Sequence, residues 1–401
     1  MNEVYICGAK RTALGTYGGA FAGVSAVELG ARAITAALDQ AGVQPTEAHE
    51  VVMGNILSAG QGMGPARQAS IAAGIPAEVP AYGINMICGS GMKAIMLGAD
   101  RIRLGYSDIV IAGGMENMSQ APYLAPGSMR FGTKMGDLGL RDHMILDALT
   151  DAFHDYHMGM TAENVADKHG ISREEQDAFA LQSQKRAGDA MEAGRFRDEI
   201  VPVTVKRKKE MVEVATDEHP RPQTTAEQLA KLRPAFRNDG SVTAGNSSGI
   251  NDGASVTVLA SAEAVKRLGL TPLARIVADG QGGVDPAYMG LGPVPAIREA
   301  LSRGGMKLSQ MDLLELNEAF AAQSLGVISE LVEEHDLEAD AIHERCNVNG
   351  GAIALGHPVG ASGNRIVVTL LHEMRRRGSR YGLASLCIGG GMGTAVIVER
   401  L

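Results

Sequence analysis

A cysteine stands where an apolar run gives way to glycine and a helical pattern begins. This residue is Cys88, in the stretch NMICGSGMKA. A thiol at the start of a helix faces unpaired N–H groups and the positive end of the helix dipole, and both favour the reactive thiolate. Most cysteines, however, serve as small buried apolar side chains. The segment by itself therefore leaves a nucleophile and a core residue as alternatives.

Three further segments hold side chains that a cysteine nucleophile would need around it. His357 lies in the glycine-dense loop NGGAIALGHPVGASG, outside any periodic element, and a nucleophilic thiol requires such a base. Cys387 closes an apolar run in ASLCIGGGMG, where glycines such as Gly389 can bring free backbone amides close to a bound atom. Asn317 ends the strand-like run in LELNEAFAAQ, where it could hold a water molecule or merely cap the next helix.

The elements that must position these residues alternate between strand-like and helix-like runs. Apolar residues recur at helical spacing over 25–42 and 91–105, and short apolar runs predict strands at 3–7, 49–57, 81–87 and 108–114. This alternation indicates an α/β fold with a mostly buried sheet. The four candidate residues each follow a strand-like run, which is the arrangement of an active site at the carboxyl edge of an open α/β sheet.

The alternation is interrupted once. Between 121 and 245 it fades into a Gly/Pro/Met-rich segment, polar helices and a hairpin whose turn carries the basic run Lys206 to Lys209. That basic run is either a solvated hairpin tip or a patch for an anionic ligand. We therefore expect an N-terminal α/β half at 1–120 (completed by about 246–270), an inserted loop domain at 121–245 and a C-terminal α/β half at 271–401.

The two α/β halves resemble each other. Residues 33–55 align without a gap with residues 296–318, and the alignment pairs Gly42 with Gly305 at the end of each predicted helix. A strand ending in Gly-Gly-Met also occurs in both halves. The repeated order of elements predicts a duplication, although many amphipathic helix-to-strand units look alike.

Composition excludes several classes of function. A net charge of −9, with aromatic residues at only 4% and no tryptophan, disfavours a nucleic-acid binder. The apolar runs fall short of the roughly 18 residues of a membrane span, and the N-terminus lacks a secretory pattern, so we expect a cytoplasmic protein that does not enter a membrane. The four cysteines form no C-x-x-C pair, and the signatures of nucleotide hydrolysis, dinucleotide binding, zinc proteolysis and serine hydrolysis are absent, so we expect no metal.

These segments together resemble the thiolase family over essentially the full length of the chain. The matching pieces are NMICGSGMKA, GGMENMS, YHMGMTAENVA, TAGNSSGINDGA, LNEAFA, NGGAIALGHPVGASG and CIGGGMG, in the order and spacing of the family. CGSG at the cysteine and HMG at 157–159 are most similar to the biosynthetic type. The resemblance implies the thiolase fold, with two duplicated halves in αβαβα layers and an inserted loop domain.

The resemblance also implies a reaction and a role for each candidate residue. Two acetyl-CoA molecules would condense to acetoacetyl-CoA and CoA, reversibly, through an acetyl group on Cys88. His357 would take the Cys88 proton, and Cys387 would move the α-proton of the second substrate. Asn317 would hold a water that, with His357, stabilises an enolate, and the amides of Cys88 and Gly389 would hold the other oxyanion.

Substrate contacts follow from the same resemblance. We expect His157, Met158, Leu149, Arg221, Phe236, Ala244, Ser248, Met289 and Phe320 to bind the acyl group or coenzyme A. No cofactor beyond coenzyme A is expected, and the segment after Pro122 matches the family's tetramerisation region, which implies a homotetramer. A 3-ketoacyl-CoA thiolase of broader chain length and a non-catalytic CoA-binding protein remain the alternatives. We also predict that Cys88 and Cys387 can be oxidised to a disulfide.

Overall fold

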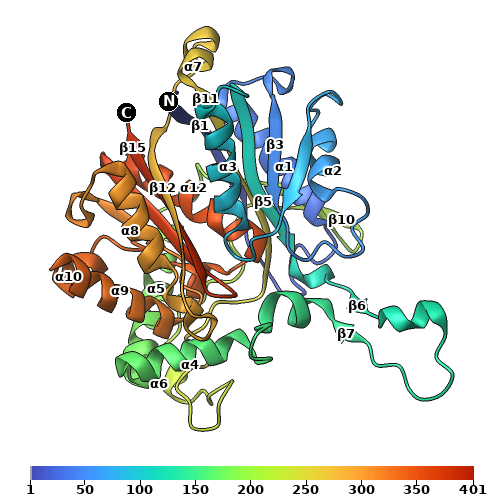
Figure 1. Ribbon diagram of the computed structural model, residues 1–401, viewed down its shortest axis with the longest axis vertical. Coiled ribbons are helices and arrows are strands. Elements are labelled where there is room, and N and C mark those ends of the chain that lie inside the picture. Colours follow the sequence, from blue (N-terminus) through green and yellow to red (C-terminus); the bar gives the residue numbers. More distant parts are fainter. Residues whose placement is uncertain (1) are drawn as a thin grey trace.

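The computed structural model describes residues 2–401 and places one continuous path of strands through the centre of the molecule (Figure 1). Nine strands follow one another along this path: β13 (Leu313–Leu316), β14 (Tyr381–Ile388), β15 (Met392–Arg400), β12 (Ala274–Gly283), β1 (Val4–Thr12), β11 (Asn251–Ser261), β5 (Ile109–Asn117), β3 (Glu50–Gly54) and β4 (Ala81–Ile84). Short strands β2 (Gly15–Thr16) and β8 (Ile200–Val201) pair with β11 and β1.

The sheet consists of two halves with the same topology, which confirms the predicted duplication. In the first half β3 runs parallel to β5, and β5 runs antiparallel to β11. In the second half β13 runs parallel to β14, and β14 runs antiparallel to β15. The halves meet where β1 pairs with β12 through Tyr5–Arg275 and Ile6–Ala274. The sequence did not reveal this junction, because it depends on pairing between the edges of the two halves.

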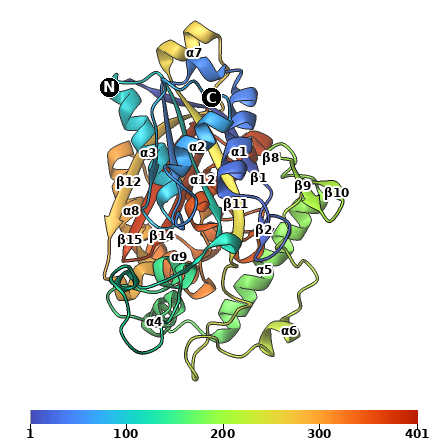
Figure 2. The same cartoon turned by 90° about the vertical axis from the view of Figure 1, so that its right-hand side faces the viewer.

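Helices cover the sheet in layers, as the resemblance implied. Helices α1 (Ala26–Ala41) and α2 (Pro65–Ala72) pack on the first half, whereas α8 (Pro293–Gly304) and α9 (Ala321–His335) pack on the second. Helices α3 (Ser90–Arg103) and α12 (Val359–Arg377) pack against each other between the halves (Figures 1 and 2). A Cβ on Gly363 would lie 2.6 Å from the Met92 nitrogen, so this central contact requires glycine.

The repeat extends to the way its helices begin and end. Helix α1 starts at the predicted cap Ser25, whose hydroxyl accepts a hydrogen bond from the Glu28 N–H at 3.1 Å. Helices α1 and α8 both stop at a left-handed glycine, Gly42 at φ 69° and Gly305 at φ 61°. These two glycines are the pair that the sequence repeat aligned. Each supplies a backbone conformation that other residues adopt only at a cost.

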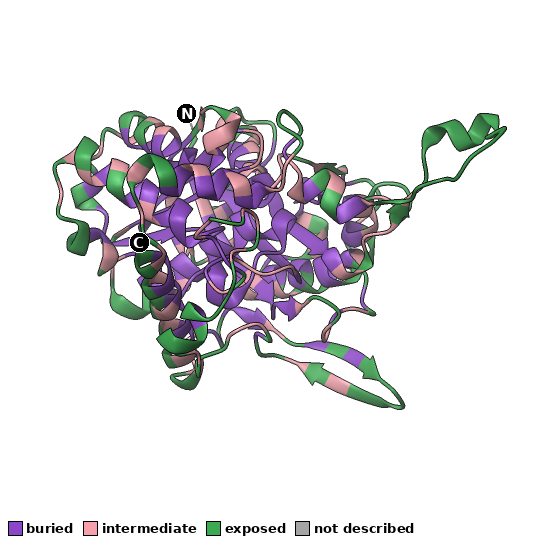
Figure 3. Cartoon of the chain, turned by 90° about the horizontal axis from the view of Figure 1, so that it is seen from below, coloured by how far each residue is buried: buried purple, intermediate pink, exposed green. Residues whose placement is uncertain are grey.

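Between β5 and β11 the alternation of strands and helices is lost, as expected. This region contains η2 (Met118–Gln120), β6 (Tyr123–Leu124), η3 (Gly127–Phe131), β7 (Arg141–Asp142), η4 (Ile145–Leu149), α4 (Met158–His169), α5 (Arg173–Glu192), β9 (Val203–Arg207), β10 (Glu210–Val214) and α6 (Ala226–Ala230). Figure 3 shows two exposed extensions, the arm between β6 and β7 and the β9–β10 hairpin with its basic turn. The three-part division of the chain stays a prediction.

Six further short elements complete the chain. They are η1 (Pro45–Glu47), α7 (Ala262–Leu268), η5 (Pro286–Leu291), η6 (Leu308–Gln310), α10 (Ala339–His343) and α11 (Ala352–Leu355). Cys7 and Cys346 are buried in the core, where burial raises the pKa of each thiol, in agreement with a structural role. Within residues 2–401, the structure contains no helix with both the length and the apolar character to cross a bilayer.

Candidate active site

Cys88 lies in a tight turn between β4 and α3, and polar groups within the turn hold its shape. Ser90, the first residue of α3, accepts a hydrogen bond from the Met86 N–H at 2.8 Å and donates one to the Ile87 carbonyl at 2.7 Å. Ile87 adopts φ 47°, a left-handed conformation that is strained for a β-branched residue. Such strain often occurs at functional sites, and here it lies directly before the cysteine.

The surroundings of Cys88 keep its thiol neutral. The half-buried side chain packs against a cluster formed by Ile56, Leu57, Met118, Met144, Ala148 and Val359. Burial raises the pKa of Cys88 to about 11, although the backbone N–H groups of Gly389 and Cys88 act in the opposite direction. The backbone donors at the helix start thus act in the expected direction, but the loss of hydration outweighs them. At neutral pH this thiol needs a base.

The second thiol approaches the first from the other half of the molecule. Cys387 lies near the end of β14 and is 1% exposed. Burial raises the pKa of Cys387, and the neighbouring Cys88 raises it further. Gly389 follows two residues later, and its backbone N–H lies close enough to the Cys88 thiol to lower the pKa of that thiol. The structure thus brings Cys88, Cys387 and Gly389 together, although Cys88 lies far from the other two in the sequence.

His357 presents one ring nitrogen to protein and keeps the other free. Its Nδ1 lies 2.6 Å from the Ser362 hydroxyl, and its backbone N–H donates to the Asn251 side chain at 2.9 Å. Nε2 is buried and has no hydrogen-bond partner among the described residues. Burial, assisted by the charge of Arg365, lowers the pKa of His357 to about 4. The ring is therefore neutral at pH 7 and able to accept a proton.

Asn317 has a buried side chain that is not a helix cap. Helix α9 begins only at Ala321, and its N-cap position is occupied by Phe320. The Asn317 backbone N–H donates to the Ser385 carbonyl at 3.0 Å, which ties the residue to β14. Within residues 2–401, neither polar atom of its amide has a hydrogen-bond partner. A buried amide of this kind is suited to bind a water molecule or a substrate oxygen.

A cavity of about 460 Å³ reaches His357, whereas Cys88, Cys387 and Asn317 are not part of its lining. Of the expected substrate contacts, it is lined by Leu149, His157, Phe236, Ala244, Ser248 and Phe320, together with His357. His157 caps α4 by accepting the Gly159 N–H on Nδ1 at 3.0 Å, and its ring stacks on Phe236 with centroids 4.6 Å apart. His157 therefore caps helix α4 and also lines the cavity.

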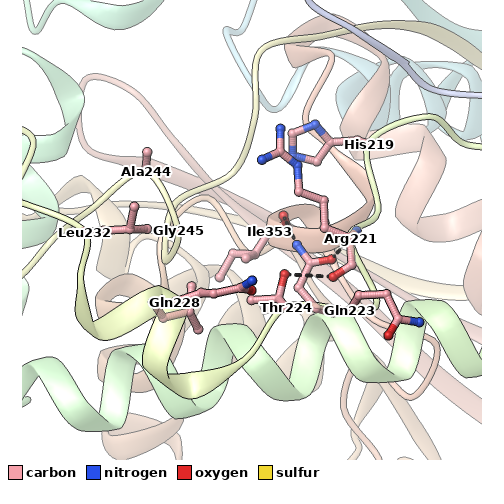
Figure 4. Close-up of a pocket in the computed structure, with 11 residues that line it drawn as sticks. His219, Arg221, Gln223, Thr224, Gln228, Leu232, Ala244, Gly245 and Ile353 are labelled. Atoms are coloured by element: carbon pink, nitrogen blue, oxygen red, sulfur yellow. Dashed lines mark hydrogen bonds between the residues drawn. The ribbon is translucent and has the colours of Figure 1, made fainter.

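Arg221 lines a second cavity, which shares a wall with the first. The second cavity measures about 430 Å³, and both cavities are lined by His219 and Ala244. Figure 4 shows His219 and Arg221 together, with Gln228 and Leu232 from the α6 region also in the lining. The Arg221 backbone N–H donates to the Gln184 side chain at 2.7 Å, while its guanidinium extends from the loop.

The two predicted methionines lie beside the second thiol rather than in the wall of either cavity. Met158 is 7% exposed and Met289 is 4% exposed, and both belong to the apolar cluster that contains Cys387 and Phe320. A Cβ added to Gly389 would lie 3.5 Å from the Met158 sulfur. Both side chains therefore pack in the core beside Cys387, and their role as the lining of an acyl pocket stays a prediction.

Sequence reasoning missed several residues of the cavities. Tyr17, His219, Ser247, Gly249, Ile250 and Val359 also line them. Gly249 and Ile250 adjoin Ser248 within a matched motif and could have been found there. Tyr17 and His219 lie in stretches without a periodic signal, and only the folded chain places them here. Within residues 2–401, no group of three His, Cys, Asp or Glu side chains could hold a metal ion.

Two family models match the chain. The thiolase N-terminal domain matches residues 4–263, and the thiolase C-terminal domain matches residues 270–400. An acetyl-CoA acetyltransferase of Pseudomonas aeruginosa is 57% identical over 401 residues, which is the full length of both chains. One from Chromobacterium violaceum is 55% identical over 99% of this chain and 100% of its own.

Solved structures give the same result. The acetyl-CoA acetyltransferase of Bacillus anthracis superimposes with a TM-score of 0.95 at 48% identity, covering 100% of this chain and 99% of its own. Human mitochondrial 3-ketoacyl-CoA thiolase in complex with CoA superimposes with a TM-score of 0.93, also at 48% identity, covering 100% and 98%. With both family models matched and full-length relatives above half identity, the chain belongs to the thiolase family.

Proposed function

We propose that this protein is an acetyl-CoA C-acetyltransferase, which condenses two acetyl-CoA to acetoacetyl-CoA and CoA and also catalyses the reverse thiolysis. The observation that carries the proposal is the pairing of two thiols from the two halves. Cys88 raises the pKa of Cys387, and the backbone N–H of Gly389, two residues after Cys387, lowers the pKa of Cys88, so the three groups are neighbours. The full-length relatives named acetyl-CoA acetyltransferase support this reaction.

In the first half-reaction, Cys88 takes the acetyl group. His357 Nε2 accepts the Cys88 proton, and the thiolate attacks the thioester carbonyl of acetyl-CoA. The N–H groups of Cys88 and Gly389 stabilise the resulting oxyanion, at roughly 3–4 kcal/mol for each well-placed donor. The C–S bond to CoA then breaks, and the departing CoA thiolate takes the proton of Cys387. This leaves acetyl-Cys88, protonated His357 and the Cys387 thiolate.

In the second half-reaction, Cys387 acts as the base. Its thiolate removes an α-proton from a second acetyl-CoA, and protonated His357 with a water on Asn317 stabilises the enolate oxygen. The enolate carbon attacks the acetyl carbonyl, and Cys88 leaves as a thiolate that recovers its proton from His357. All three groups return to their starting protonation states. The low pKa of His357 fits this role, because the imidazolium forms only when an anion is present.

Coenzyme A is a substrate in this proposal, and the residues that line the two cavities would bind it. His157, Phe236, Ser248 and Phe320 would contact the chain that carries the thioester. Arg221 would approach the distal end, where phosphate groups favour a guanidinium. This assignment is supported by the shared wall at Ala244, which makes the two cavities neighbours.

Chain length separates this proposal from its rival within the family. Met158 and Met289 crowd the region of Cys387 and would restrict the acyl group to two carbons on the nucleophile. A 3-ketoacyl-CoA thiolase of broader range stays the second candidate, because human mitochondrial 3-ketoacyl-CoA thiolase is 49% identical over 100% of this chain. Comparing thiolysis of acetoacetyl-CoA with that of longer 3-ketoacyl-CoAs decides between them. A preference for long chains excludes the acetyl-specific function.

The covalent intermediate gives a direct test of the proposed function. Incubation with acetyl-CoA should add the mass of one acetyl group, and peptide mapping should place it on Cys88. The Cys88→Ser variant should remain unlabelled. Labelling of another residue, or none in the wild type, contradicts the proposed nucleophile.

We further propose that the protein is a homotetramer assembled through the arm between β6 and β7. The arm exposes large apolar side chains, including Phe131 at 91% and Met135 at 92%. Contiguous exposed apolar residues of this kind mark interaction surfaces. Light scattering should report a tetramer for the wild type and a smaller species for a variant with both residues changed to serine. The cytoplasmic location stays a prediction.

A further inference from the structure

Ser362 contacts the imidazole of His357 through Nδ1, the ring nitrogen that does not act as the base in the proposed reaction. It lies in the first turns of α12, is fully buried, and its hydroxyl is 2.6 Å from His357 Nδ1. The same oxygen lies 2.9 Å from the Pro358 carbonyl, in the geometry of a donor to that carbonyl. A serine hydroxyl has a single proton, so it can donate to only one of these two neighbours.

The direction of this hydrogen bond decides what His357 can do. If the hydroxyl donates to the Pro358 carbonyl, it must accept a hydrogen bond from Nδ1–H, and a neutral ring then carries no proton on Nε2. If the hydroxyl instead donates to Nδ1, the neutral ring carries its proton on Nε2 and cannot serve as a base there. A helical serine commonly donates to the carbonyl four residues earlier, which is the position of Pro358.

Two hydrogen bonds anchor the backbone that carries His357 and Ser362. The His357 N–H donates to the Asn251 side chain at 2.9 Å. The Gly360 N–H donates to the buried carboxylate of Glu116 at 3.0 Å. Because both donors lie within five residues of Ser362, the hydroxyl and the ring are held at a fixed separation.

We propose that Ser362 is a positioning residue for the reaction, acting through His357. It accepts the hydrogen bond of Nδ1–H and thereby holds His357 in the tautomer whose Nε2 is free to take the Cys88 proton. When the Cys88 S–H bond breaks, a new N–H bond forms on Nε2, and the Nδ1 bond to Ser362 is retained in the imidazolium. This inference rests on the proposed function, in which His357 is the base.

The first test is Ser362→Ala, with Ser70→Ala as its control. Ser70 is also a fully buried helical serine, and its hydroxyl has no hydrogen-bond partner within residues 2–401. In Ser362→Ala we expect kcat for thiolysis to fall on the order of 10- to 100-fold, with KM nearly unchanged. This loss is smaller than the roughly 10²–10⁴-fold that a general base itself typically contributes. The rate of Cys88 alkylation by iodoacetamide at pH 7.5 should fall in parallel. Ser70→Ala should match the wild type in both.

A second measurement does not depend on the variant folding. Neutron diffraction from wild-type crystals in deuterated buffer should place deuterium on Nδ1, directed at the Ser362 oxygen. Deuterium on the Ser362 hydroxyl directed at a bare Nδ1 overturns the inference, as does a Ser362→Ala variant with wild-type kcat and alkylation rate. If the wild type lacks thiolase activity, the proposed function fails. The alkylation and neutron results still test the direction of the hydrogen bond between Ser362 and His357 and its effect on Cys88.

Discussion

Gly114 constrains the position of His357, the proposed base, although it belongs to a buried strand. A Cβ at this position of β5 would lie 1.9 Å from the Gly360 carbonyl oxygen and 2.7 Å from its carbon. In Gly114→Ala the first turn of α12 has to retreat by about 1.1 Å to restore a separation of 3.0 Å. His357 precedes Gly360 by three residues and would move with it. A displacement of about 1 Å typically costs on the order of 100-fold in rate.

The assay is CoA-dependent cleavage of acetoacetyl-CoA, measured for Gly114→Ala beside Gly23→Ala. An alanine Cβ at Gly23 would meet no atom within 4 Å, so this control should keep wild-type activity and stability. We expect Gly114→Ala to lose roughly 100-fold in kcat and about 1–3 kcal/mol in free energy of unfolding. A Gly114→Ala protein with kcat within twofold of the wild type refutes the reasoning, because the helix start would then not hold the base.

Four further outcomes follow from the geometry of the site. Asn317→Ala should lower kcat for condensation on the order of 10²–10³-fold, as the loss of one oxyanion donor does, while Cys88 is still acetylated. An equal loss of acetylation and condensation would count against the role of Asn317 in stabilising the enolate. Met289→Ala should raise kcat/KM for a six-carbon 3-ketoacyl-CoA relative to acetoacetyl-CoA, and an unchanged ratio would argue against an acyl pocket there. Since burial raises the pKa of Cys88 to about 11, its alkylation in the free protein should keep accelerating as pH rises above 8, and a plateau at pH 7 contradicts this. Mild oxidation should inactivate the protein through a disulfide with Cys387, and activity that dithiothreitol fails to restore speaks against that bond.

The position of the site could be predicted from the sequence because its residues follow the ends of regular elements. Cys88 follows β4, Asn317 follows β13 and Cys387 lies near the end of β14, each where an apolar run stops. The repeat also predicted the matched helix ends at Gly42 and Gly305, since left-handed glycines have a local cause. Such features depend on neighbours in the chain, and the sequence displays them directly.

Features that depend on distant segments could not be predicted. The raised pKa of Cys88 results from a cluster that draws on residues from Ile56 to Val359, whereas the sequence showed only the local donors, which lower that pKa. His219 joins the two cavities from a loop without any periodic signal. Ser362 is one of several small residues in a glycine-rich stretch, and only the fold shows which of them meets the imidazole.

The most direct test of the account compares the wild type with Cys88→Ser in the CoA-dependent loss of acetoacetyl-CoA. We predict rapid loss of acetoacetyl-CoA with the wild type and almost none with the variant, because the acetyl group is proposed to bind to the Cys88 sulfur. The same assay with longer 3-ketoacyl-CoAs should give slower turnover. Wild-type protein that leaves all of these substrates unchanged, or a Cys88→Ser variant as active as the wild type, would contradict the central claim.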